Sequence, residues 1–381
     1  MEDPIVLAEQ ARHDTPEGAQ AATALVGLGA AAVPAILDAV RDAPFAQVER
    51  LIAVLRRMKA PQVLDSLVQG LSAPEAEVAL AVFETLGRWK DARPLRPLVD
   101  ALGHPVHARM AIQALGRLGD PGAIEPLRKV ASEQLAGVLE PETLEAHLTT
   151  LKEEGDWSPL ELVLEAAVAL ARLGRQDLAH VPIRVATLGR DAEDCDEVTP
   201  LRIQASSALK SIVAPGAFDA AVAALEDPDA EVRNNALTAT LLMGSVEAVP
   251  HWLARISSGD SEQAALAYST LNDFTGEWPA GKELVETLEE GELEAWWRGV
   301  EARFSLDVCY RLGAPVSPHL LFPLLEQPSL ALPVQEELEV LTGHVFGQGE
   351  APDSWWTRES ARFEPGRLYR YGFKYEPRAI F

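Results

Sequence analysis

The chain has 381 residues, more than one compact globule usually holds, so several domains or a repeat array are expected. Hydrophobic residues make up 48% of it but aromatic residues only 6%, which indicates a core built mainly from Ala, Leu and Val. The net charge of −25 disfavours nucleic acid as a partner, because binding to phosphates depends on clustered Lys and Arg.

The ends of the chain and its cysteines indicate a cellular compartment. Cys195 and Cys309 cannot form a disulfide framework, which favours a reducing environment. The first ten residues lack the basic start and apolar stretch of a signal peptide. We find no uncharged apolar run close to the roughly 20 residues that a membrane span needs. We therefore expect a cytoplasmic protein without membrane contact.

A repeated segment organises the first two thirds of the chain. The stretch from Glu84 to Leu98 returns from Gln113 to Leu127, 29 positions later, and looser copies begin at Gly27, Leu173 and Met243. In each copy an Ala/Leu-rich helix stops at or near a glycine, and a proline falls in the first turn of the next helix. This pattern predicts helical hairpins at about 17–41, 45–70, 74–101, 104–132, 158–188, 199–224 and 227–256.

One copy carries a recognisable signature. The stretch from Asp227 to Leu237, DPDAEVRNNAL, is similar to the D-P-x-x-x-V-R-x-x-A pattern of HEAT repeats. The period near 30 resembles the short bacterial HEAT-like repeats of phycobilisome-lyase-type proteins. The resemblance implies an all-α solenoid of helical hairpins. We expect Asp227 to cap a helix, Pro228 to take the first helical position, and Val232 and Ala236 to be buried.

Two acidic insertions interrupt the repeats. The first, 134–157, lengthens one connection, and the second, 190–200, follows the next hairpin. Insertions into a solenoid tend to emerge on one face, so these two are expected to line a common edge.

The last third of the chain contains a duplication. The pattern W-W-x4-A-R-F-x5-Y-R-x-G occurs at 296–313 and again at 355–372, each time after a helix that ends in Thr-Gly. We predict a solenoid over 1–246, duplicated units at 247–313 and 316–372 that cap its open end, and an aromatic, basic tail at 373–381. We expect the tryptophan pairs to pack in the hydrophobic core and not to form a surface on which a ligand stacks. The motif arginines Arg303, Arg311, Arg362 and Arg370 are expected to meet helix carbonyls or nearby acids.

The sequence offers no catalytic or metal-binding constellation. His104 and His107 straddle a probable turn without a third ligand, and no His is followed by Glu, unlike in metal-bearing HEAT hydroxylases. The acidic run from Asp191 to Glu197 lacks the spacing of a calcium loop. We find no phosphate loop or nucleophile elbow. We therefore predict a protein that is not an enzyme and holds no cofactor.

The predicted function is that of a scaffold or adaptor, a monomer or weak oligomer, that binds a protein partner along the inner curve of the solenoid. We expect the second helix of each hairpin to form this curve. Two alternatives are complex assembly through the C-terminal arm and a lyase-like chaperone that binds a cofactor. The candidate binding residues are Arg56, Arg57, Glu84, Arg88, Gln113, Arg117, Arg172, Asn234, Asn235 and Thr238, with Tyr369, Tyr371, Phe373 and Tyr375 in the arm.

Overall fold

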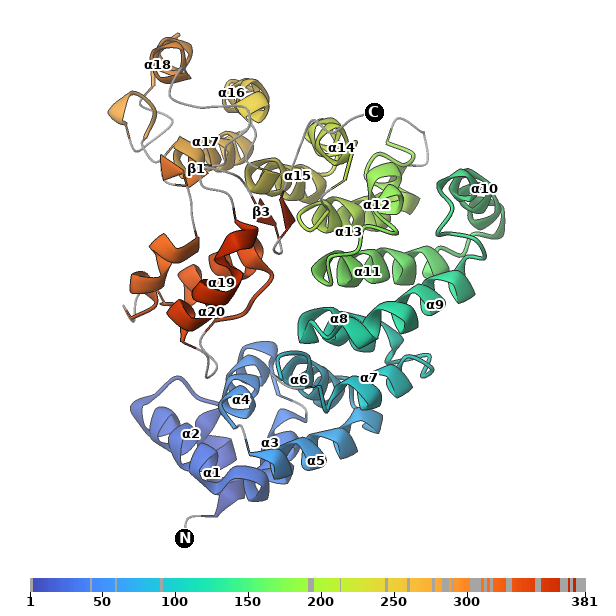
Figure 1. The fold of residues 1–381 in the computed structure, drawn as a ribbon, viewed down its shortest axis with the longest axis vertical. Helices are drawn as coiled ribbons and strands as arrows, with labels where there is room; N and C mark the ends of the chain where they lie inside the picture. Colours follow the sequence, from blue (N-terminus) through green and yellow to red (C-terminus); the bar gives the residue numbers. More distant parts are fainter. Residues whose placement is uncertain are drawn as a thin grey trace. The chain divides into compact units, whose positions relative to one another are not determined.

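A computed structural model describes most of the chain, which forms two compact units, Met1–Glu133 and Gln134–Phe381 (Figure 1). Each unit is treated separately below. The described residues are 3–41, 43–58, 60–89, 92–190, 195–212, 214–243, 246–258, 261–275, 278–282, 288–289, 291–301, 310–311, 314–315, 318–326, 331–346, 351–363, 369–370 and 373–374.

The first unit stacks helices in two layers. Helices α2, α4, α6 and α8 pack one on the next, and α3, α5 and α7 pack against that row (Figure 1). The helices are α1 (Pro4–Ala11), α2 (Pro16–Leu28), α3 (Val33–Val40), α4 (Phe45–Arg57), α5 (Pro61–Gln69), α6 (Ala76–Gly87), α7 (Leu95–Ala101), α8 (Ala108–Leu118) and α9 (Ile124–Gln134).

Glycine and capping side chains set the helix ends in this unit. Helix α8 stops at Gly119, whose φ of 72° is a left-handed conformation that favours glycine. Helix α2 begins after Thr15, whose hydroxyl accepts a hydrogen bond of 3.0 Å from the backbone N–H of Gly18. The glycines and capping residues of the repeated sequence pattern therefore mark the ends of helices in the structure.

One apolar stretch contradicts an expectation from the sequence. Pro16–Val40 is long and apolar enough to cross a membrane by length and composition alone, so the expectation that no such run exists is wrong. In the structure this stretch comprises α2, a 3-10 turn from Gly29 and α3. Its side chains Leu25, Val33 and Ile36 are buried in the core of the first unit. A buried core helix passes the same test of length and composition.

A close approach between α6 and α8 gives a first prediction. A Cβ atom on Gly87 would lie 2.8 Å from the Cα and 3.0 Å from the carbonyl oxygen of Ala114, so Gly87→Ala forces the two helices apart. We expect a loss of about 1–3 kcal/mol in the free energy of unfolding, measured by urea denaturation. Gly27→Ala is the matched control, because it also lies near a helix end but has no atom within 4 Å of its Cβ position. The control should be neutral or stabilising by up to about 1 kcal/mol; equal effects at the two sites would contradict the steric argument.

The second unit, taken by itself, also has two helix layers. Helices α11, α13, α15 and α17 pack in sequence, and α12, α14 and α16 pack against them (Figure 1). The helices are α10 (Leu144–Glu154), α11 (Ser158–Arg172), α12 (His180–Val185), α13 (Thr199–Leu209), α14 (Ala217–Ala224), α15 (Ala230–Met243), α16 (Val249–Ile256), α17 (Ser261–Thr275), α18 (Glu292–Val300), α19 (Ala331–Thr342) and α20 (Pro352–Glu359), with a 3-10 helix at Pro318–Glu326.

The predicted all-α solenoid of helical hairpins is confirmed. Each predicted hairpin corresponds to two consecutive helices, from α2 and α3 at the first to α15 and α16 at the last. The strands within the described residues are two-residue pairs near the C-terminus. Helix α10 was not predicted, because it lies within the first acidic insertion.

The loop before α15 differs from the prediction. The carboxylate of Asp229, not Asp227, caps the helix by accepting from the N–H groups of Glu231 at 2.9 Å and Val232 at 3.0 Å. Pro228 therefore lies just outside α15. Val232 and Ala236 are buried as expected.

Asp227 has a different partner. Its carboxylate accepts from the guanidinium of Arg202 on α13, with Nε and Oδ2 2.8 Å apart, and both side chains are 0% exposed. The ion pair links two successive repeats. No local pattern could have revealed it, because Arg202 lies 25 residues earlier in the chain.

The two copies of the Trp-Trp pattern have the same order of elements. Each has a helix that ends in Thr, then a helix with the Trp-Trp pair, then a β-hairpin whose strands are two residues long. Strand β1 (Tyr310–Arg311) pairs with β2 (Ala314–Pro315) and contacts α17, and β3 (Tyr369–Arg370) pairs with β4 (Phe373–Lys374) and contacts α19. The domain limits given above remain a prediction.

The tryptophan pairs lie in core clusters, as expected. Trp297 is 6% exposed beside Leu293 on α18, and Trp355 is 3% exposed among Phe346 and Phe363. Of the motif arginines, Arg362 pairs with Glu359 three residues earlier. Arg303 lies outside the described residues, and only the backbone is described at Arg311 and Arg370.

Candidate functional site

Within each unit, the predicted binding residues on helices lie in one helix layer, which is not the layer that the sequence predicted. They lie on, or directly after, the first helix of their hairpins, so the expectation that second helices carry them is wrong. Both helices of a pair bury one face, and the hydrophobic spacing alone does not distinguish the two layers. The structure places Arg56 and Arg57 on α4, Glu84 and Arg88 at the end of α6, Gln113 and Arg117 on α8, Arg172 on α11, and Asn234, Asn235 and Thr238 on α15.

Four of these residues come together in the first unit. We call Arg56, Glu84, Arg88 and Arg117 the arginine patch. The Glu84 carboxylate accepts from Nη2 of Arg56 at 3.0 Å with one oxygen and from Nη1 of Arg117 with the other. Since Glu84 is only 15% exposed, this one carboxylate links α4, α6 and α8 from a largely covered position.

The arginine patch carries more positive than negative charge. Two arginines bond to the one glutamate and Arg88 adds a third cation, so these four residues carry a formal sum of two positive charges. The pKa of Arg56 is lowered by burial, then by the nearby charge of Arg88, while Glu84 opposes the shift. The Nε atoms of Arg56 and Arg88 are buried without a hydrogen-bond partner among the described residues. Such a patch favours an approaching anion, and a carboxylate suits the planar guanidinium fork.

The predicted asparagines of the second unit connect helices to each other. Asn234 accepts a 2.6 Å hydrogen bond from the side-chain amide of Gln263 on α17. Asn235 accepts a 2.7 Å bond from the ammonium of Lys210, the residue directly after α13. Thr238 donates to the backbone oxygen of Asn234 at 3.1 Å. The two asparagines link α15 to its neighbouring helices, and all three side chains are already engaged within the fold.

The predicted aromatic arm is described only in part. Tyr369 and Phe373 lie in the β3–β4 hairpin, of which the backbone is described. Tyr371, Tyr375 and most of the predicted tail lie outside the described residues. Because β3 contacts α19, this part of the arm packs against its own chain.

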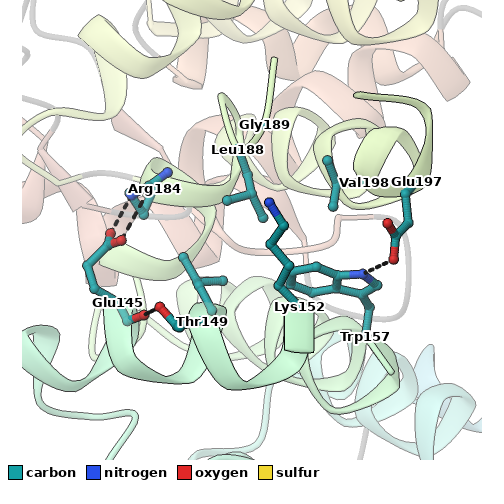
Figure 2. A pocket seen from close by; sticks show the side chains of 10 residues that line it. Glu145, Thr149, Lys152, Trp157, Arg184, Leu188, Gly189, Glu197 and Val198 are labelled. Carbon is teal, nitrogen blue, oxygen red and sulfur yellow. Dashed lines mark hydrogen bonds and ion pairs between the residues drawn. The ribbon is translucent and has the colours of Figure 1, made fainter. Parts of the chain in front are cut away.

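A pocket that the sequence did not predict lies between the two acidic insertions (Figure 2). Its volume is about 230 Å³. The indole N–H of Trp157 in the first insertion donates to the Glu197 carboxylate in the second at 3.4 Å, so the predicted common edge is confirmed for these two residues. The lining residues are Glu145, Leu148, Thr149, Lys152, Trp157, Arg184, Leu188, Gly189, Glu197 and Val198.

A signal for this site was present in the sequence. Leu144, Leu148 and Leu151 follow helical spacing and are buried on one face of α10, so the insertion could have been recognised as helical. The acid-rich Asp191–Asp194 segment lies outside the described residues.

The histidine pair shows no metal-like geometry. Among the residues that the structure describes, no group of three His, Cys, Asp or Glu could hold a metal ion. The rings of His104 and His107 stack with centroids 4.3 Å apart. Burial lowers the pKa of His107, and the nearby His104 lowers it further, which favours a neutral imidazole.

Stacked helix pairs with a charged patch on one layer define a helical repeat protein. The family of HEAT repeats matches residues 64–146, from α5 into α10. An engineered protein of known crystal structure aligns with 88% of this chain and 87% of its own, at 17% identity and a TM-score of 0.30. No curated protein matches the sequence.

Proposed function

We propose that this chain is a non-catalytic, cytoplasmic scaffold or adaptor that binds an acidic segment of a protein partner through the arginine patch. Stacked helical pairs provide extended surfaces of this kind. The match to HEAT repeats supports the scaffold role, since such repeats commonly mediate protein interactions.

The observation that carries this proposal is the sharing of Glu84 by two arginines while Arg88 adds a third positive charge beside them. The chain as a whole has a net charge of −25, so a local excess of positive charge distinguishes this patch as a place where an acidic segment can bind. The overall charge repels a long nucleic-acid backbone but permits a short acidic peptide to approach one patch. Arginine is also enriched among residues that dominate binding energy at protein interfaces.

The proposal is tested by removing the charge of Arg88. Arg88→Gln leaves both bonds to Glu84 in place, so the fold should be retained while the positive excess falls. We expect at least one partner protein, captured from cell extract and quantified by mass spectrometry, to be recovered about fivefold less, equivalent to about 1 kcal/mol. Its binding to the purified chain should also weaken with rising salt.

The matched control is Arg96→Gln. Arg96 lies on α7, in the other helix layer of the same unit, and its side chain is 91% exposed. The control should recover the partner as the unchanged protein does. If every captured protein is retained equally by both variants, the arginine patch is not the binding surface. A partner released by nuclease treatment would show that the ligand is a nucleic acid, which contradicts the proposal.

A further inference from the structure

The pocket between the insertions has a chemically divided lining (Figure 2). Leu148 and Val198 are buried in its wall, and Leu188 and the Trp157 indole extend the apolar surface. The rim carries two carboxylates and two cations. An apolar wall with a few charged groups around it is typical of a small-molecule site.

Two of the four charges neutralise each other. Arg184 and Glu145 form two parallel hydrogen bonds, one of them 3.1 Å between Nη2 and Oε2. This bidentate arrangement satisfies both groups and closes one side of the pocket. It leaves Lys152 and Glu197 as the charges that can act on a ligand.

Lys152 and Glu197 are opposite in sign and weakly engaged. Lys152 forms no ion pair with any residue that the structure describes, and the one printed contact of Glu197 is the 3.4 Å hydrogen bond from Trp157, at the long end of the useful range. In Figure 2 the ends of these two side chains flank the Trp157 indole. A ligand above the indole would meet a positive group on one side and a negative group on the other.

The size of the pocket limits the ligand. Sites for drug-sized molecules measure roughly 300–1,000 Å³. At about 230 Å³, this pocket falls below that range and is suited to a molecule with a short apolar body. A ligand with only a carboxylate would be attracted to Lys152 but repelled by Glu197. A ligand with only an ammonium would be attracted to Glu197 but repelled by Lys152.

We infer that the pocket binds a small zwitterion of the α-amino acid class with an apolar side chain. Its carboxylate pairs with Lys152, its ammonium pairs with Glu197, and its side chain packs against Leu148, Leu188 and Val198. The site lies in the second unit, whereas the arginine patch lies in the first, so the two proposals can fail independently.

The test is calorimetric titration of the full chain with L-leucine and L-phenylalanine as probes, each compared with its N-acetyl and amide derivatives. N-Acetylation removes the ammonium and amidation removes the carboxylate. We expect the free amino acids to bind at millimolar concentrations or tighter, and each blocked form to bind about 10- to 100-fold more weakly, because a charge-assisted hydrogen bond is lost.

Two substitutions assign the two ends of the ligand. Lys152→Met should weaken binding of the free amino acid about 10-fold or more but should not weaken binding of the amide, which Lys152 repels. Glu197→Gln should weaken binding of the free amino acid to a similar extent but should not weaken binding of the N-acetyl form, which Glu197 repels. The matched control is Glu153→Gln, on the same helix but outside the lining, which should bind as the unchanged protein does. All three positions are exposed, and thermal melts should confirm that the variants fold.

Three results would overturn the inference. The first is no binding of either amino acid by the unchanged chain at 10-fold above the millimolar range, about 10 mM. The second is equal binding of free and blocked forms, which would make the pocket an apolar anchor site. The third is unchanged affinity after Lys152→Met and Glu197→Gln together.

Discussion

Replacing Asp227 with Ala is expected to lower the free energy of unfolding by about 3–5 kcal/mol, measured by urea denaturation. The substitution removes the carboxylate that lies 2.8 Å from Nε of the Arg202 guanidinium, and both side chains are 0% exposed. Arg202 keeps hydrogen bonds to Thr199 at 3.0 Å and to the backbone oxygen of Leu188 at 3.3 Å, but neither carries a negative charge. Most of the loss therefore reflects the missing charge-assisted hydrogen bonds of this buried pair.

Asp229→Ala provides the control within the same loop. It also removes one carboxylate, but from an exposed N-cap, so the expected loss is about 1 kcal/mol. Replacing both members of the buried pair, as in Arg202→Met with Asp227→Leu, should restore much of the stability lost by Asp227→Ala, because apolar side chains need no counter-charge. If Asp227→Ala and Asp229→Ala cost the same, the buried pair is not an important link between repeats.

The two copies of the Trp-Trp motif should respond differently to the same change. Trp355→Ala is expected to cost about 3–5 kcal/mol, because this side chain is 3% exposed and contacts Phe346 edge-on with ring centroids 4.9 Å apart. Trp296→Ala, at the corresponding motif position, should lower the free energy of unfolding by about 1 kcal/mol, because Trp296 is only partly buried and packs against the surface of its core cluster. Urea denaturation measures both losses.

The second members of the pairs give the reverse comparison. Trp297 is buried and Trp356 is partly covered, so Trp297→Ala should be the more damaging of the two. Neighbouring residues on a helix point about 100° apart, so burial of the second tryptophan in one copy and the first in the other reflects a rotated helix. Equal losses at Trp296 and Trp355 would show that the motif, and not its local packing, determines stability.

The hairpins could be predicted because glycine and proline have strong local effects. Gly119 ends α8 in a left-handed conformation, and Pro61 opens α5, as the repeated pattern required. Helix α10 was missed because the acids in its segment indicated a connection, although Gly155 ends it in a left-handed conformation and its leucines follow helical spacing. Local patterns therefore located most helices and left out one that departs from the repeat.

The sites were less predictable because they depend on contacts between distant residues. Arg56, Glu84 and Arg117 were each selected from the sequence as surface candidates, but their convergence on one carboxylate was not. The choice of helix layer was wrong because it depends on how the pairs stack. The pocket was missed because Trp157 and Glu197 are 40 residues apart and meet only in the folded chain.

The origin of the pocket walls has an evolutionary consequence. Much of its lining belongs to sequence inserted between repeats, including α10, Trp157 and Glu197, while the residues that set the spacing of the helix pairs lie elsewhere. Ligand preference can therefore drift by changes within the insertions while the spacing of the array stays constant. A homologue with shorter connections would retain its stacked helices and lose this cavity.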